Sequence, residues 1–150
     1  MDTQIALDSV IRLNKILANL AIALFNSLNA HWKITVVAFA SNHEFFKMLY
    51  ENTFTRMDDI AERIRALNGM PTASLSRYLA LATLHEDDTP EADTLHLNRF
   101  ATLHQNWEEI VTQLHTTLAE TPAQDVGTKN LLEGIVADME KEAWMIKSHL

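Results

Sequence analysis

The chain of 150 residues contains no cysteine and has only three glycines and three prolines. Without cysteine, disulfides, thiolate zinc sites and cysteine nucleophiles are excluded. The few glycines form neither a phosphate-cradling loop nor the sharp turn that presents a catalytic serine. The sequence therefore argues against the common nucleotide-binding and hydrolase motifs.

Long apolar runs are also missing. No segment approaches the roughly 18 consecutive apolar residues of a membrane span, so no transmembrane helix is predicted. The N-terminal residues MDTQIALDSV contain neither a basic region nor a continuous apolar region. No secretion signal is therefore predicted, and a cytoplasmic location is expected.

Basic residues are outnumbered, because 12 Lys and Arg face 20 Asp and Glu, which gives a net charge of −8. Neither end of the chain carries a cluster of Lys or Arg. Such a chain repels phosphate backbones overall, so direct DNA binding is disfavoured.

Apolar residues recur at three- and four-residue intervals, which predicts long amphipathic helices in a single domain spanning residues 1–150. The long helices are predicted at about residues 3–33, 41–67 and 89–121, with a last helix ending at Leu150. The connection over about residues 69–89 carries one short predicted helix. Four long helices with a long middle crossover predict an all-α fold, a ferritin-like four-helix bundle.

Local patterns refine these helices. Ser41 and Glu44 form a capping-box pattern, which predicts that the second helix begins at Ser41. Turn residues predict the other boundaries, at Asn68-Gly69, Thr89-Pro90 and Thr121-Pro122. The predicted core stripe of the first helix consists of Leu7, Val10, Ile11, Asn14, Leu17, Ala18, Ala21, Leu24, Phe25 and Leu28.

Histidines and carboxylates on helices suggest a metal site. No glutamate is followed by histidine three residues later, so the usual di-iron site within one bundle is not supported. Asp58 and Glu62 lie one helical turn apart, but fifteen residues, about 22 Å of helix, separate Asp58 from His43. Two antiparallel copies of the second helix, related by a two-fold axis near residue 51, could bring them together. His31 would join His43 across the corner of residues 34–40.

Several motifs resemble one known family. They are His31-Trp32, Phe39, His43-Glu44, Tyr50, the stretch DDIAERIRALNGMP from Asp58, and the C-terminal WMIKSHL from Trp144. Together they resemble the Dps family, the DNA-binding proteins from starved cells, over essentially the whole chain. The spacing His-x11-His-x14-Asp-x3-Glu is the ferroxidase signature of that family.

The resemblance implies a ferroxidase, an oxidoreductase that oxidises Fe(II), preferably with hydrogen peroxide, and stores ferric mineral. It implies a hollow dodecamer built from two-fold dimers. The iron ligands and catalytic residues would be His31 and His43 of one subunit with Asp58 and Glu62 of its mate.

Some positions depart from the family pattern or stay open. Lys47 stands where the family usually has aspartate, and it could oppose a second iron ion or pair with a carboxylate of the site. The family's corner glycine is replaced by Val36. Asp125 is the one candidate for a pore-lining residue. Trp32 and Trp144 are interpreted as core or interface aromatics, or alternatively as redox-active residues near the iron.

Other interpretations concern the surface and the function. The stripe of His104, Glu108 and His115 is interpreted as an outer face, with a metal pair as the alternative. The run from Glu86 to Asp88 is interpreted as a solvated loop, with a cation-gathering patch as the alternative. Two rival functions are a structural protein that coats DNA with little catalysis and a shell whose oxidation is weakened by Lys47.

Overall fold

A computed structural model describes residues 1–35, 38–90 and 97–150. The described residues form five helices and no strand: α1 (Thr3–Lys33), α2 (Phe39–Ala66), α3 (Leu75–Leu81), α4 (Leu97–Glu120) and α5 (Val126–Lys147). This arrangement confirms the predicted all-α bundle with a short helix in its middle crossover. No helix of the described chain combines the length and the hydropathy that a membrane span requires.

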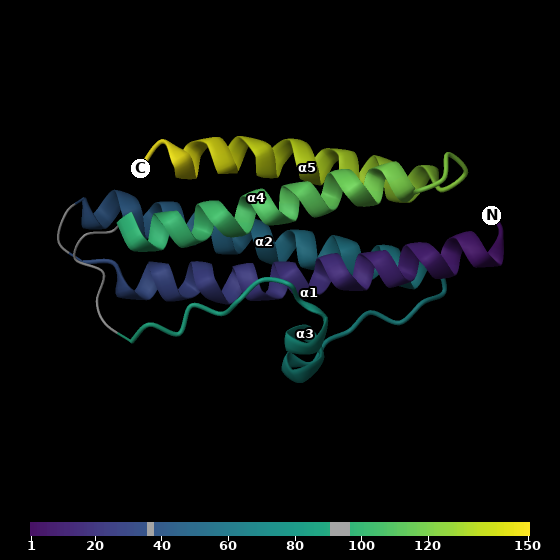
Figure 1. The fold of residues 1–150 in the computed structure, drawn as a ribbon, viewed down its shortest axis with the longest axis horizontal. Helices are drawn as coiled ribbons and strands as arrows, with labels where there is room; N and C mark the ends of the chain where they lie inside the picture. The colour runs from purple at the N-terminus through teal and green to yellow at the C-terminus, as the bar shows by residue number, and fades with distance from the viewer. Residues whose placement is uncertain (36–37, 91–96) are drawn as a thin grey trace.

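The four long helices form two hairpins, α1 with α2 and α4 with α5, which pack side by side (Figure 1). The crossover that carries α3 runs along α1 outside the bundle. Helices α2 and α5 make little contact with each other, and a groove of about 670 Å³ separates them. The largest fully buried side chains are Trp107, Phe46, Phe100, Leu13, Ile16 and Leu17.

The predicted core stripe of α1 is wrong in part. Leu7, Ile11 and Phe25 are each about half exposed, whereas Leu13 and Leu20, outside the predicted stripe, are fully buried. The reason is that α1 is apolar on two faces, and helical spacing cannot tell which of them faces the bundle. The second face remains available for another chain.

The start of α2 also differs from the prediction. The helix begins at Phe39, after Ala38 adopts a left-handed conformation with φ of 49°. The Ser41 hydroxyl donates to the Ala38 carbonyl at 3.1 Å, so the predicted capping box does not form. The turn at Ala38 starts the helix two residues early and leaves Ser41 inside it. Val36, the other predicted corner residue, lies outside the described residues.

The predicted end of α2 is confirmed. Asn68 is left-handed with φ of 64°, and the Gly69 N–H donates to the Ile64 carbonyl at 2.9 Å, as in a Schellman motif. A Cβ atom on Gly69 would lie 2.6 Å from a Val10 methyl group. The glycine therefore allows the end of α2 to approach α1 closely.

Two predicted boundaries of the second hairpin need correction. Thr89 and Pro90 are not helical, and the described part of α4 begins at Leu97; residues 91–96 lie outside the described residues. Helix α4 ends before Thr121 as predicted, but α5 ends at Lys147. Leu150 is therefore exposed rather than part of the core.

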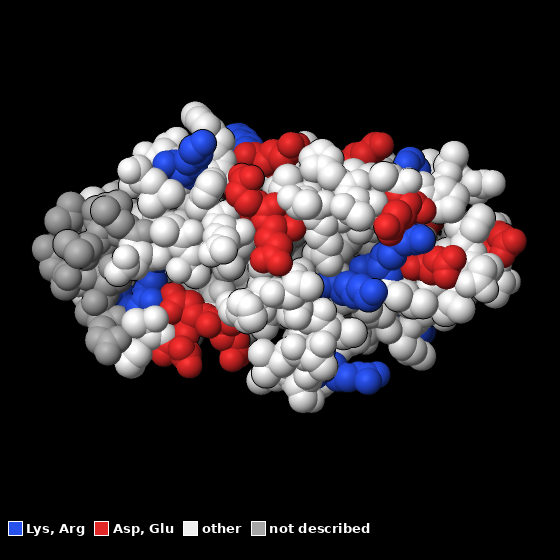
Figure 2. Space-filling view, in the orientation of Figure 1, with Lys and Arg blue, Asp and Glu red and all other residues white. Residues whose placement is uncertain are grey.

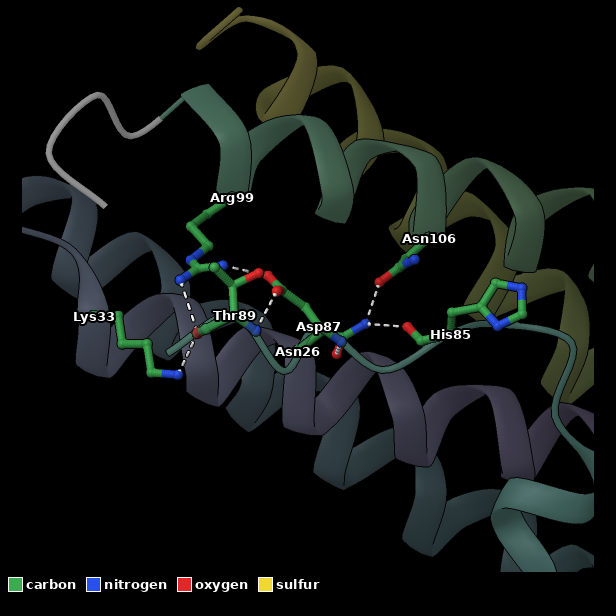
Figure 3. A network of polar contacts seen from close by, with 7 residues as sticks. All are labelled: Asn26, Lys33, His85, Asp87, Thr89, Arg99 and Asn106. Atoms are coloured by element: carbon green, nitrogen blue, oxygen red, sulfur yellow. Dashed lines mark hydrogen bonds and ion pairs between the residues drawn. The ribbon is translucent and has the colours of Figure 1, made fainter. Parts of the chain in front are cut away.

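An asparagine of α1 fixes the crossover to the bundle (Figure 3). The Asn26 amide donates to the His85 carbonyl at 3.0 Å and to Asn106 Oδ1 at 2.8 Å, and its oxygen accepts from the Asp87 N–H at 2.8 Å. One side chain thus provides hydrogen-bond partners for backbone groups of a segment that has no regular secondary structure. Asn14 and Asn19 bond the crossover in the same manner further along α1.

The end of the crossover is held by charged groups, as Figure 3 shows. Arg99 donates to Asp87 at 2.7 Å, and both Arg99 and Lys33 donate to the Thr89 carbonyl. Burial raises the pKa of Asp87, but hydrogen bonds from Thr89 and the Arg99 charge outweigh it, so the pKa lies below its usual value. Asp87 is therefore a paired structural residue, which corrects the solvated-loop interpretation there. The last turn of α1, which carries His31, is tied to this network through Lys33.

Candidate metal site

The structure brings His31 and His43 together at the corner between α1 and α2. Their imidazole rings are stacked, with centroids 3.6 Å apart and planes 16° from parallel. His31 lies in the last turn of α1 and is buried, whereas His43 lies near the start of α2 and is half-buried. Both side chains therefore belong to one constellation.

Reciprocal hydrogen bonds fix how each ring presents its nitrogens. His31 Nδ1 lies 2.7 Å from the His43 carbonyl oxygen, and His43 Nδ1 lies 2.8 Å from the His31 carbonyl oxygen. Carbonyl oxygens only accept, so each Nδ1 must carry the proton. In the neutral ring the lone pair is then on Nε2, and no described residue bonds to either Nε2. Metal-binding histidines in proteins typically have this arrangement.

Two aromatic rings flank the imidazole pair. Phe39 stacks on His43 with ring centroids 4.9 Å apart, and Tyr50 meets His31 edge-on with centroids 5.3 Å apart. The four rings form a column that restricts the orientation of both imidazoles. The sequence contains Phe39 and Tyr50 among its family motifs, but nothing in their spacing predicts this contact.

Asp58 and Glu62 are exposed on α2 and make no hydrogen bond or ion pair with any described residue. About 22 Å of helix still separates Asp58 from His43. Within the described part of one chain, no three His, Asp or Glu side chains are grouped so that they could hold a metal ion. A single chain therefore holds the predicted ligands as two separate pairs.

Lys47 lies one turn after His43 on α2. Its Nζ lies 3.9 Å from Glu51 Oε1, and both side chains are about half exposed. This is a weak contact between side chains on one helix surface. Lys47 is not paired with Asp58 or Glu62 of its own chain.

An apolar groove of about 460 Å³ lies between α1 and α2, at the middle of α2. Its lining consists of Leu24, Leu28, Tyr50, Glu51, Phe54 and Thr55. The Phe54 side chain is 64% exposed, which is unusual for a large aromatic residue unless another surface covers it. Its lining from α2 includes Glu51, the residue near which a two-fold axis is predicted if two copies of α2 pack antiparallel.

Asp125 is a structural residue in this chain. It is the N-cap of α5 and is buried, and it accepts hydrogen bonds from Ser9 at 2.6 Å, Arg63 at 2.7 Å and the Thr128 N–H. Burial raises the pKa of Asp125, but these hydrogen bonds outweigh it and the pKa lies below its usual value. Both carboxylate oxygens are occupied, so this placement does not favour the predicted pore role.

The two tryptophans of interest are both on the surface. Trp32 is 70% exposed and Trp144 is 66% exposed, so neither lies in the core of the chain. Near Trp144, the stripe on α4 is an outer face, where His104 approaches Glu108 at 3.6 Å and His115 approaches Glu140 at 3.4 Å.

One buried polar cluster was not predicted. Arg56 donates to both oxygens of Glu142, at 2.7 and 2.6 Å, and Trp107 Nε1 donates to Glu142 at 3.1 Å. The cluster joins α2, α4 and α5 inside the bundle. No local sequence pattern predicts a contact between an arginine and a glutamate that are 86 positions apart.

Known proteins resemble the chain over nearly its full length. The ferritin family model, a ferritin-like domain, matches residues 11–150. DNA protection during starvation protein 2 of Bacillus anthracis is 30% identical over 139 residues, covering 92% of this chain and 93% of that protein. General stress protein 20U of Bacillus subtilis is 32% identical over 143 residues, covering 91% of this chain and 93% of that protein.

A solved structure agrees with these relatives. The Dps protein of Vibrio cholerae O1, described as a member of a broad superfamily of ferritin-like diiron-carboxylate proteins, has a TM-score of 0.90 at 27% identity. The match covers 99% of this chain and 92% of that one. The family match and these relatives confirm the resemblance found in the motifs, and the chain belongs to the Dps family of ferritin-like proteins.

Proposed function

We propose that the protein is a cytoplasmic miniferritin that oxidises Fe(II), preferably with hydrogen peroxide, and stores the ferric product inside a shell of about twelve chains. The observation that carries this proposal is the division of the ligands. Among the described residues, the stacked histidines have two free Nε2 atoms but no carboxylate beside them, and Asp58 and Glu62 have no hydrogen-bond or ion-pair partner.

A second chain would complete the site. If two α2 helices pack antiparallel, His43 lies level with Asp58 or Glu62 of the second helix when the axis passes residues 50–53. The apolar groove is lined by side chains from this part of α2, so the same contact would cover Phe54. Each dimer would then contain two identical sites.

The donor set suits Fe(II) as a substrate. Imidazole nitrogens and carboxylate oxygens both bind this ion, and the carboxylates offset its charge. Reduction of one hydrogen peroxide, with two protons, to two waters takes two electrons, and each Fe(II) that is oxidised to Fe(III) supplies one of them. Because the chain itself holds the nitrogen atoms rigid, ligand reorganisation during the reaction would be small.

Direct DNA coating is not part of the proposal. The net charge is −8, and on the face shown in Figure 2 the basic side chains are dispersed among acidic ones. This face offers no continuous basic surface for a phosphate backbone.

Lys47 would limit each site to one Fe(II). Asp58 and Glu62 bring two negative charges, and one ammonium on the His43 side cancels one of them, so a second divalent ion meets net repulsion. We expect wild-type protein to bind one Fe(II) per site in anaerobic equilibrium dialysis, and Lys47→Asp to bind two. The matched control is Lys15→Asp, which makes the same charge change at an exposed position of α1.

The controls make this result decisive. Lys15→Asp should bind as the wild type does. Two Fe(II) ions per site in the wild type, or one in Lys47→Asp, would refute the role of Lys47. If the wild-type protein binds no Fe(II), the proposed function itself is refuted.

A further inference from the structure

Met70 is an exposed methionine whose sulfur lies against a guanidinium group. Its side chain is 74% exposed, just after the end of α2. Arg65, in the last turn of α2, donates from Nη1 to Met70 Sδ at 3.1 Å and to the Gly69 carbonyl at 2.9 Å. The bond to the carbonyl holds the guanidinium beside the sulfur.

The backbone on both sides of this contact is also held. The Gly69 N–H donates to the Ile64 carbonyl at 2.9 Å, and Asn14 of α1 donates to the Met70 carbonyl at 3.2 Å. The thioether is therefore open to solvent but keeps a fixed place relative to Arg65.

Both groups retain capacity for a further partner. A guanidinium has five N–H groups, and the two bonds from Nη1 use two of them. Nε and Nη2 of Arg65 make no bond with any described residue. A sulfide has two lone pairs, so the sulfur keeps one that Arg65 does not engage. A small oxidant from solvent therefore meets a nucleophile and a cationic donor together.

We propose that Met70 and Arg65 form a reactive methionine site, at which hydrogen peroxide oxidises the sulfur to the sulfoxide. A sulfur lone pair attacks one peroxide oxygen, so that an S–O bond forms and the O–O bond breaks. The departing oxygen takes the proton of the attacked oxygen and leaves as water. The sulfur gives both electrons and no metal ion takes part, so this inference does not rest on the proposed function.

Arg65 would act on the departing oxygen. Negative charge develops on that oxygen as the O–O bond breaks, and a cationic N–H donor that is already in place stabilises it. One charged hydrogen bond of this kind, at a site open to solvent, is expected to speed the oxidation by about threefold to tenfold.

The other five methionines lack this arrangement. Four of them are buried or half-buried, namely Met48, Met57, Met139 and Met145. Met1 is 61% exposed, but among the described residues only the sulfur of Met70 accepts a hydrogen bond. The order in which the methionines are oxidised therefore tests the proposal.

The test compares each methionine with a free reference compound. Assembled, metal-free wild-type protein in chelator is mixed with hydrogen peroxide and N-acetylmethionine amide, and peptide mass spectrometry follows the sulfoxide at each position. We expect Met70 to be oxidised at least about threefold faster than the reference, and the other methionines no faster than it. In Arg65→Gln the rate at Met70 should fall to that of the reference. Arg77→Gln, at an exposed position of α3, should leave it unchanged.

Met70→Leu provides a second measurement that leaves Arg65 and Gly69 in place. It should remove a fast phase that consumes about one hydrogen peroxide per chain, since each chain has one Met70. Oxidation of Met70 at the reference rate, equal rates at Met70 in wild type and Arg65→Gln, or earlier oxidation of another methionine would overturn the inference. Persistence of the fast phase in Met70→Leu would overturn it as well.

Discussion

The double variant His31→Ala/His43→Ala is expected to lose rapid Fe(II) oxidation, with an initial rate more than about 100-fold below that of the wild type. Loss of a residue that only orients a metal ligand costs about 10–100-fold, and this variant removes the ligand atoms themselves. The rate is read from the ferric absorbance after addition of hydrogen peroxide.

A matched variant tests whether the loss of oxidation is specific to the two histidines of the site. His104→Ala/His115→Ala removes two histidines of the outer face of α4 and should oxidise Fe(II) at the wild-type rate. Because His31 and His43 also bond each other's backbone, native mass and circular dichroism must show that the first variant still assembles. Normal oxidation by an assembled His31→Ala/His43→Ala protein would exclude these residues from the site.

Arg56→Met is expected to lower the free energy of unfolding by about 3–5 kcal/mol, because it leaves the Glu142 carboxylate charged and without its partner inside the bundle. Arg56 is 7% exposed and Glu142 is 4% exposed, so both charges are largely removed from solvent. The measurement is urea unfolding at a fixed protein concentration, since assembly contributes to apparent stability.

A second substitution should restore most of this loss. Arg56→Met/Glu142→Gln removes both charges and keeps an oxygen acceptor for Trp107 Nε1. Arg77→Met, on the exposed surface of α3, should change stability by less than about 0.5 kcal/mol. Equal stability of Arg56→Met and wild type would show that the buried ion pair does not hold α2 to α5.

Periodicity predicted the helices well and the buried faces less well. Helix α1 is predicted almost to the residue because its apolar spacing is continuous. Its core face was misassigned because Leu7, Ile11 and Phe25 repeat as regularly as the buried leucines do. A face that another chain covers carries the same pattern as a core face.

Short-range patterns failed where tertiary contacts decide. Ser41 and Glu44 have the spacing of a capping box, but the left-handed turn at Ala38 starts α2 earlier. Asp125 looks like a free acidic residue in the sequence, yet Arg63 from α2 and Ser9 from α1 occupy its oxygens. Such partners are distant in sequence, so no local pattern indicates them.

Within the candidate site, the pairing of the two histidines could be predicted because the family motif is specific. The spacing of His31 and His43 indicated a shared site, and the structure stacks the two rings. Asp58 and Glu62 were expected to come from another chain because about 22 Å of helix lies between Asp58 and His43. The orientation of the imidazoles and the contact with Tyr50 could not be predicted from the sequence, because both depend on how the corner between α1 and α2 folds.

The shared site is tested most directly by mixing two inactive variants. His31→Ala/His43→Ala and Asp58→Ala/Glu62→Ala are each expected to lack rapid oxidation when assembled alone. In a mixed dimer one site receives both damaged halves, and the other receives intact histidines from one chain and intact carboxylates from its mate.

Co-refolded mixtures of the two variants should therefore recover rapid Fe(II) oxidation at up to about half the sites of each mixed dimer, by isologous counting. Native mass must confirm that mixed dimers form. Mixed dimers with no recovered oxidation at any ratio would contradict a site built from two chains.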